Sequence, residues 1–438
     1  MLTSYRAWRV AGLAVRSSIS LGLNLKNTSD STDLSTESRY RVWWCLYALE
    51  NMLGIMTGRV TYISDGVCKT PFPLPFDEEN LSDLTATKLL NNHDLHCAFI
   101  ESNLACFDIR HMRVHPQGSE EASHAGHMSN PSWLKSQSAC SAMGFLYYID
   151  LTVILQEIVN QVYSLDSCSL PWSDVEDRIR ILKSRVDLWR SNLPEAYDFT
   201  RLDDQDPDLL REKLFLGFHF YSSLITLGRP CLCRHESRRS DPAQKSTFSH
   251  GIALIALESA RLMLDLIPNS PDPVWLFQNC PFWCILHYIM QAGTVLLLEL
   301  SLNCIHVPED RKGILDYSRK AALWLLAMSH HSLASRRAWE LCDSTLRRIV
   351  HGTGYDMSDF YTREYTDTPQ REHQPQPPHV QQGQAEFSHP QESSIRSEVH
   401  SPEPVPANPE FPFDPISGDL IRSFFPVIQE DNPWDVIL

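Results

Sequence analysis

The stretch RYRVWWCLYALENMLGIMTGRVTYISDGVCKTPFPLP, residues 39–75, joins an aromatic helical pattern, a Gly-Arg turn and an exit broken by prolines. One stripe recurs at steps of three and four residues, as on one face of an α-helix, with the members Trp43, Leu46, Tyr47, Glu50 and Leu53. Ser35 or Thr36 is expected to cap this helix, and Gly58 to end it. The stretch therefore predicts a core helix followed by an exit loop.

A first helix is predicted upstream of this stretch. Residues at the same spacing line one face of this helix, namely Tyr5, Trp8, Gly12, Val15 and Ile19. Gly22 is expected to end it, and a polar loop follows. After the loop, Glu37 and Arg41 stand four residues apart and are expected to pair.

Residues 171–194, PWSDVEDRIRILKSRVDLWRSNLP, form the clearest local helical signal. Ser173 and Glu176 have the spacing of a capping box. One apolar seam follows at alternating steps of four and three, in Val175, Ile179, Leu182, Val186, Trp189 and Leu193. Pro194 is expected to close the helix.

Further helical patterns run to about His351, and alternation typical of strands is almost absent, apart from a short piece at residues 61–63. The remaining helices are expected near residues 81–113, 132–164, 209–227, 250–267, 277–302, 309–330 and 332–350. Gly228-Arg229-Pro230 is expected to stop the one at 209–227. The sequence therefore predicts an all-α fold, a large irregular helical domain of about ten or more helices over residues 1–352.

Composition narrows the classes of protein to consider. The chain has 438 residues, of which 43% are hydrophobic, so it can bury a large core. Its net charge of −16 gives no general attraction to nucleic acid. The twelve scattered cysteines and the absence of a signal-like start indicate a reducing compartment. The apolar run 282–302 carries His287, Gln291 and Glu299, which favours a buried helix over a membrane span.

The C-terminal part changes character. Residues 366–409 are rich in Pro, Gln, Ser, His and Glu, so they are expected to form a disordered linker. Residues 410–438 interleave acids with large apolar side chains. Such a tail stays solvated through its charge and offers anchors to the groove of a partner, for which Phe424, Phe425 and Trp434 are the candidates.

Catalytic and metal-binding motifs are weak. Cys231-x-Cys233-x-His235 is the densest group of metal-capable ligands, but a zinc site needs four, and no second pair is near in sequence. No nucleophile elbow, phosphate loop or dinucleotide fingerprint occurs. Arg234, Arg238 and Arg239 are interpreted as a solvated face. We therefore expect no enzyme, no metal and no cofactor in this chain.

The Gly-Arg turn predicts a structural latch. Gly58 can adopt a positive φ, and the Arg59 fork that follows could bind Asp65 or helix-end carbonyls. Glu50 could pair with cations near Arg39 or Arg59. A latch between helix and exit loop is the preferred interpretation over a ligand contact, because buried arginine pairs most often serve architecture.

Residues 39–75 also resemble a known family, the central regulatory region of fungal zinc-binuclear-cluster transcription factors. That family has a helix of the type R-R-x-W-W-x-L-Y-x-L-E-R, then G-R-P, Ile-x-Asp and an exit with prolines. The matching positions here are Arg39, Arg41, Trp43, Trp44, Leu46, Tyr47, Leu49, Glu50, Gly58, Arg59, Ile63, Asp65, Pro71, Pro73 and Pro75. AWRVAGLAVRSSISLGLN and FHFYSSLITLGRPCL are similar to two further stretches of the family, so the resemblance covers most of residues 1–351.

The chain departs from the family in two places. Val60 stands where the family usually has Pro. The family's zinc cluster, which begins C-x2-C-x6-C, has no counterpart among the cysteines here. The resemblance therefore implies a transcription regulator without its own zinc, with no direct nucleic-acid contact expected from this chain and no membrane.

In detail, the resemblance implies a nuclear protein that regulates RNA polymerase II transcription, in some members of the family for one pathway, such as a secondary-metabolite gene cluster. Residues 410–438 would be an activation tail that binds transcription machinery or a coactivator. The alternative is a truncated paralogue, deficient in DNA binding, that forms heterodimers with a full-length factor. Homodimers and a small-molecule effector remain open.

Overall fold

The computed structural model describes residues 2–26, 34–63, 68–106, 139–202, 207–233 and 247–351. These ranges contain twelve α-helices and no strand, residues 61–63 included, which confirms the all-α class. The helices are α1 (Leu2–Ser20), α2 (Leu34–Thr57), α3 (Leu84–Asn91), α4 (His93–Asn103), α6 (Ser141–Val162), α7 (Trp172–Asn192), α8 (Pro207–Cys233), α9 (Thr247–Asp265), α10 (Pro273–Asn279), α11 (Ile285–Ser301), α12 (Arg311–Ser329) and α13 (Leu333–His351). The expected linker and tail lie outside the described residues.

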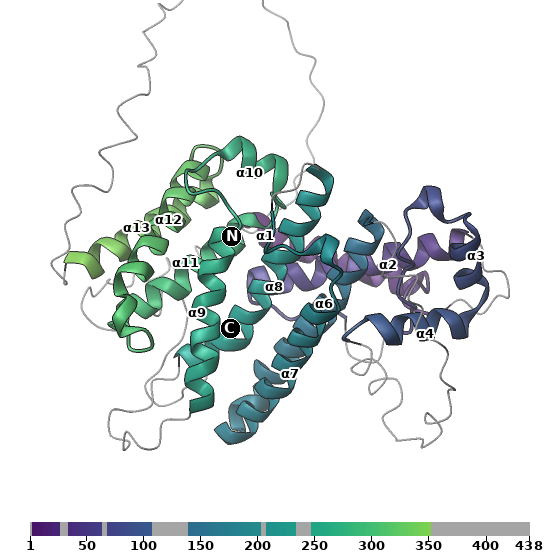
Figure 1. The fold of residues 1–438 in the computed structure, drawn as a ribbon, viewed down its shortest axis with the longest axis horizontal. Coiled ribbons are helices and arrows are strands. Elements are labelled where there is room, and N and C mark those ends of the chain that lie inside the picture. Colours follow the sequence, from purple (N-terminus) through teal and green to yellow (C-terminus); the bar gives the residue numbers. More distant parts are fainter. Residues whose placement is uncertain are drawn as a thin grey trace, which may run out of the picture.

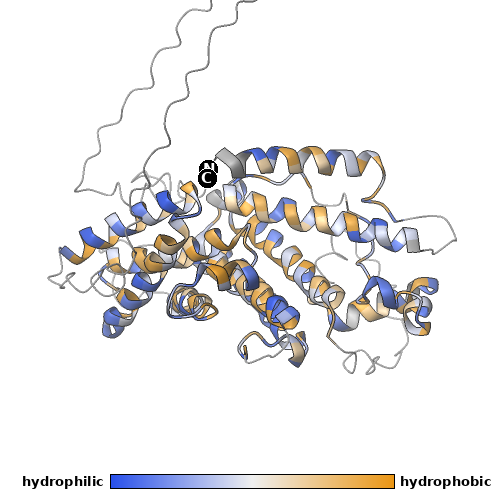
Figure 2. Ribbon diagram, turned by 90° about the horizontal axis from the view of Figure 1, so that it is seen from above, coloured by the Kyte–Doolittle hydropathy of each residue, from blue (hydrophilic) through white to orange (hydrophobic). Residues whose placement is uncertain are grey.

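Helix α8 lies at the centre of the molecule and packs against α6, α7, α9 and α11 (Figure 1). Helix α11 also packs against α12 and α13, and α2 contacts the core at α6. Most helices alternate hydrophilic and hydrophobic residues along their length (Figure 2), as expected for helices with one buried face.

Among the helices that the structure describes, one, α6, is long and apolar enough to cross a membrane by length and composition, and 78% of its most apolar window is buried inside the protein. It lies between α2, α7 and α8. The run 282–302, where the sequence favours a buried helix, forms only the 17-residue α11 and the turn before it.

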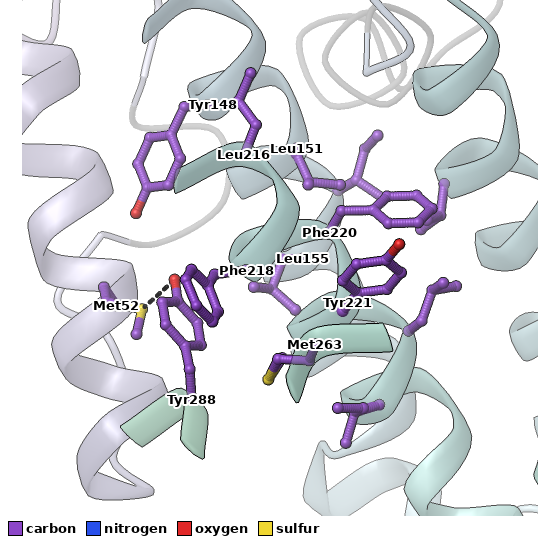
Figure 3. Close-up of a cluster of buried hydrophobic side chains, with 14 of the residues drawn as sticks. Met52, Tyr148, Leu151, Leu155, Leu216, Phe218, Phe220, Tyr221, Met263 and Tyr288 are labelled. Carbon is purple, nitrogen blue, oxygen red and sulfur yellow. Dashed lines mark hydrogen bonds between the residues drawn. The ribbon is translucent and has the colours of Figure 1, made fainter. Parts of the chain in front are cut away.

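An aromatic cluster joins α2 to the core (Figure 3). Phe218 of α8 stacks on Tyr288 of α11 with ring centroids 5.4 Å apart. The Tyr288 hydroxyl in turn donates to the sulfur of Met52 on α2 at 3.7 Å. All three side chains are almost fully buried, so the opening stretch of the sequence is anchored in the centre of the fold.

The seam predicted in residues 171–194 is confirmed, because its six apolar side chains are all buried, five of them in α7 and Leu193 directly after it. The capping box is wrong. Helix α7 begins at Trp172 with Pro171 before it, so Ser173 already lies in the first turn. The Glu176 carboxylate instead accepts hydrogen bonds from the Trp172 indole, at 2.9 Å, and from the Ser249 hydroxyl.

The predicted stop at Gly228-Arg229-Pro230 is also wrong, since α8 continues through Pro230 to Cys233. Proline lacks the N–H that would bind the carbonyl of Thr226, four residues back. The hydroxyl of Tyr163, at the end of α6, donates to that carbonyl. Gly228 serves packing, because a Cβ there would stand 2.7 Å from the Cβ of Ala256 on α9.

Two other boundaries differ from the expected ones. The pattern at 81–113 contains the two short helices α3 and α4, and Asn92 between them caps α4 through the Leu95 N–H at 3.0 Å. The run 277–302 breaks into α10 and α11 at Pro281. The residue before a proline avoids helical geometry, and Cys280 is extended there.

Candidate interaction site on the first two helices

Helices α1 and α2 form an antiparallel hairpin closed by glycines. Gly22 after α1 and Gly58 after α2 have φ of 66° and 62°. At each end the next two amides turn back onto the helix: the N–H groups of Gly58 and Arg59 bind the carbonyls of Ile55 and Gly54, at 3.4 and 2.9 Å. This pair of hydrogen bonds is the Schellman motif, and it confirms both predicted helix ends.

The two helix ends are tied crosswise. The indole N–H of Trp8, early in α1, donates to the carbonyl of Val60, just after α2, at 3.2 Å. Arg39, early in α2, donates to the carbonyl of Leu21, just after α1, at 3.0 Å. The hairpin is thus fixed at both ends.

Glu50 joins α2 to its exit loop. Its side chain is 0% exposed, and one carboxylate oxygen accepts the Tyr62 N–H at 2.8 Å. The other oxygen has no hydrogen-bond partner among the described residues. Burial raises the pKa of this carboxyl, and the Tyr62 amide offsets only part of the rise. The cationic partner expected for Glu50 is therefore replaced by a backbone amide.

The other two residues of the predicted latch are Asp65 and Arg59. Asp65 lies outside the described residues, so its pairing with Arg59 stays a prediction. The Arg59 guanidinium is exposed and lies over the ring of Trp8, 5.1 Å from its centroid. This cation–π contact links the Gly-Arg turn to α1.

Two residues of α1 and two of the exit loop form a ladder of alternating contacts, in the order Arg59, Trp8, Tyr62 and Arg16. It was not predicted from the sequence as a site. The rings of Trp8 and Tyr62 stack with their centroids 5.3 Å apart. The Arg16 guanidinium lies over the Tyr62 ring, 4.5 Å from its centroid. Gly12 leaves room for Tyr62, since a Cβ there would stand 2.2 Å from the ring. The W-x-x-x-G spacing of Trp8 and Gly12 is the signal that could have revealed it.

The later part of the exit loop lies along α2. Glu37, only 1% exposed, accepts from Arg41 at 3.0 Å, as the spacing predicts, and from the Leu74 N–H at 2.8 Å. Burial outweighs both bonds and raises the pKa of Glu37. The Trp44 indole donates to the Pro71 carbonyl at 2.7 Å. The tryptophan positions of the opening stretch thus hold the proline-rich loop.

The solvent side of this hairpin differs in charge from the rest of the chain. Within residues 2–26 and 34–63 there are seven Lys and Arg and two acids, a difference of +5 in a chain of net charge −16. Both acids, Glu37 and Glu50, are buried. Six of the seven cations are exposed, namely Arg6, Arg9, Arg16, Lys26, Arg39 and Arg59.

Large apolar side chains stand among these cations. The exposed ones on α1 and just after it include Val10, Leu13 and Leu21, at 63%, 60% and 68% exposure. Those on α2 are Val42 and Leu49, at 50% and 38%. Surfaces that combine apolar and basic groups suit contact with an acidic, apolar partner better than chemistry on a small substrate.

Metal chemistry finds no support in the described part of the chain, where no group of three or more His, Cys, Asp or Glu side chains could hold an ion. Cys231 and Cys233 lie in the last turn of α8, and His235 lies outside the described residues. Phe424, Phe425 and Trp434 also lie outside them, so their role as anchors stays a prediction.

Comparison with known proteins shows what this chain is similar to. Residues 1–191 match the model of the fungal specific transcription factor domain. The chain is 34% identical over 390 residues to "Transcription regulator galc" of Aspergillus niger, a match that covers 81% of this chain and 45% of that protein. No solved structure matches the chain.

Two other relatives match shorter parts. "Negative regulator of pleiotropic drug resistance STB5" of Candida glabrata is 34% identical over 88 residues, 19% of this chain and 9% of that protein. A transcriptional regulatory protein of Schizosaccharomyces pombe is 26% identical over 245 residues, 49% of this chain and 37% of that protein. The chain thus spans less than half the length of these curated relatives.

Proposed function

We propose that this chain, whose residues 1–191 match the model of the fungal specific transcription factor domain, regulates RNA polymerase II transcription in the nucleus, for a particular pathway. The helical part acts as the regulatory region, and residues 410–438 recruit transcription machinery or a coactivator. The supporting observation is the match to the A. niger transcription regulator, which spans 81% of this chain.

The described geometry is consistent with regulation by contact. The α1–α2 hairpin is fixed by glycine turns, by crosswise hydrogen bonds and by the Trp8–Tyr62 stack, so it presents a rigid surface. Rigid surfaces bind partners with less loss of conformational entropy than mobile ones.

A reporter assay tests the role of the tail. Residues 410–438 are fused to a foreign DNA-binding domain, and expression of a reporter is measured. The matched control carries Phe424→Ala, Phe425→Ala and Trp434→Ala, which remove the apolar anchors and keep every acid. Activation by the first fusion and its loss in the second support the proposal.

Equal silence of the two fusions would contradict an activation tail. Repression of a reporter that is already active would instead assign the tail a negative role. Silence would also favour the alternative in which the chain acts by pairing with a related factor, and co-purification of the full chain with such a factor would then be measured.

A further inference from the structure

We propose that two copies of this chain associate through an apolar surface around α10. This surface, the α10 patch, consists of Val274 and Phe277 of α10, Phe282 and Trp283 of the turn before α11, and Leu333 at the start of α13. The contact is symmetric, because the patch of one copy packs against the same patch of the other. The inference goes beyond the proposed function and holds whether or not the chain regulates transcription.

The α10 patch exposes aromatic side chains that folded proteins normally bury. Phe282 is 66% exposed, Phe277 44% and Trp283 39%. Among the residues whose burial the structure describes, no other Phe or Trp side chain is exposed. Exposed apolar side chains that stand singly are ordinary, whereas aromatic ones gathered on one surface mark a contact site.

The members of the patch come from elements that meet at the edge of the described fold (Figure 1). The ring of Phe277 lies edge-on to that of His331, with centroids 6.0 Å apart, so the end of α10 touches the turn between α12 and α13. Leu333 begins α13 two residues later. Helix α10 packs on α8 and is buried at Leu276, which leaves Val274 and Phe277 on its outer side.

The size of the patch suits a transient pair of copies. A fully buried aromatic side chain covers about 150–250 Å², so the exposed parts of the five side chains amount to about 500 Å². Two such patches in contact bury about 1,000 Å², close to the lower limit of a specific interface. Interfaces of this size are typical of weak complexes, and a dissociation constant of about 10 μM is expected.

The charges around the patch complement one another in a symmetric pair. The exposed Asp272 lies at the start of α10, while the exposed Arg336 and Arg337 lie on α13, beyond the contact between Phe277 and His331. In a two-fold contact, residue i of one copy meets residue j of the other, and j meets i. The acid of each copy can therefore pair with the arginines of the other.

Local charge favours a second copy over a strongly charged partner. Residues 268–284 and 330–340 contain two acids and two arginines, a difference of zero. Of the net charge of −16, residues 352–438 carry −11, from fifteen acids and four arginines. Charges elsewhere in the chain are screened beyond about 10 Å at 0.1 M salt. A neutral surface offers little to a strongly acidic or basic partner, whereas a second copy gains the apolar contact and the ion pairs.

Sedimentation velocity of the full chain tests the association. One copy has a mass of 50.1 kDa. With a dissociation constant of about 10 μM, about four-fifths of the chains are paired at about 100 μM, and about one in seven at about 1 μM. A mass that stays at that of one copy over this whole range would overturn the proposal.

Val274→Asp and Val10→Asp are a matched pair of variants. The two valines are 64% and 63% exposed on helices, and both variants change the net charge equally, but only Val274 lies in the α10 patch. An acid in the first turn of α10 is favourable to the helix, so the fold is kept. The symmetric contact contains the change twice, so Val274→Asp should raise the dissociation constant at least about a hundredfold.

Val10→Asp should leave the dissociation constant unchanged. Circular dichroism should show the same helix content in both variants and in the unaltered chain. Equal weakening by the two variants, with helix content retained, would overturn the α10 patch as the contact surface.

A charge reversal tests the two-fold arrangement. Arg336→Glu with Arg337→Glu places acids opposite Asp272 of the second copy and should weaken association about tenfold. Adding Asp272→Asn removes the facing charge and keeps the cap of α10, because Asn caps helices as well as Asp does. This third change should restore most of the lost affinity, and a lack of recovery would overturn the symmetric pairing.

Discussion

Replacing Tyr163 by Phe tests why α8 continues through Pro230. The Tyr163 hydroxyl donates a hydrogen bond to the Thr226 carbonyl. That carbonyl lacks its helical partner because Pro230 has no N–H. Phe removes this hydroxyl and keeps the ring over which the Arg229 guanidinium lies, 5.3 Å from the centroid. The substitution therefore removes the bond to the Thr226 carbonyl together with the contact of the hydroxyl to the Arg229 side chain.

An unsatisfied buried carbonyl costs about 1–3 kcal/mol. The bond here is only partly buried, so water replaces some of it, and Tyr163→Phe is expected to lower the free energy of unfolding by about 1–2 kcal/mol. Urea unfolding of the full chain, followed by tryptophan fluorescence, should show a lower midpoint at an unchanged m-value.

A double-mutant cycle separates this cause from general damage to the core. In Pro230→Ala the new N–H at residue 230 can bind the Thr226 carbonyl, so the same Tyr163→Phe change should then cost less than about 0.5 kcal/mol. Equal costs with and without Pro230 would refute the explanation, since the hydroxyl would then have no link to the missing amide.

Three further predictions concern other parts of the fold. Gly12→Ala would force its new Cβ into Tyr62, 2.2 Å away, and should cost about 1–3 kcal/mol in the same unfolding assay; no cost would show that the ring moves aside freely. Trp189→Ala should cost about 3–5 kcal/mol, because the fully buried ring and its 2.9 Å bond to the Tyr147 carbonyl are lost, while Leu188→Ala, at a 41% exposed neighbour, should change stability by less than about 0.5 kcal/mol. Burial raises the pKa of Glu212 from 4.5 to about 7, so the folded state binds this proton more tightly than the unfolded state, and stability should fall as pH rises from about 4.5 to about 7. Glu212→Gln should remove that part of the slope, at most about 3 kcal/mol, and an unchanged pH profile would contradict the assignment.

The candidate site was predictable only in part. Spacing in the sequence placed Glu37 opposite Arg41 and the ends of α1 and α2 at Gly22 and Gly58, and the structure agrees. The partner of Glu50 was not predictable, because it is the backbone amide of Tyr62, twelve residues later, in an exit loop with no periodic pattern.

Sequence by itself determined the features that depend on neighbours along the chain. Helical periodicity predicted the all-α class and the seam of α7, because residues three and four apart share a helix face wherever the helix lies. Glycine has no Cβ and so adopts a positive φ without a steric clash. The helix ends at Gly22 and Gly58 were therefore also determined by the local sequence.

Tertiary structure decided what depends on residues that are distant in sequence. Where Pro230 continues a helix, Tyr163, 67 residues earlier, supplies a hydrogen bond to the carbonyl that the proline leaves without its helical N–H. The capping box at Ser173 gave way to a bond between Glu176 and Ser249 on α9. The basic, apolar surface of α1 and α2 exists because folding buries both acids of residues 2–26 and 34–63 and leaves six of the cations there exposed. Local spacing cannot state which charges are buried, since burial is set by the helices that pack across the chain.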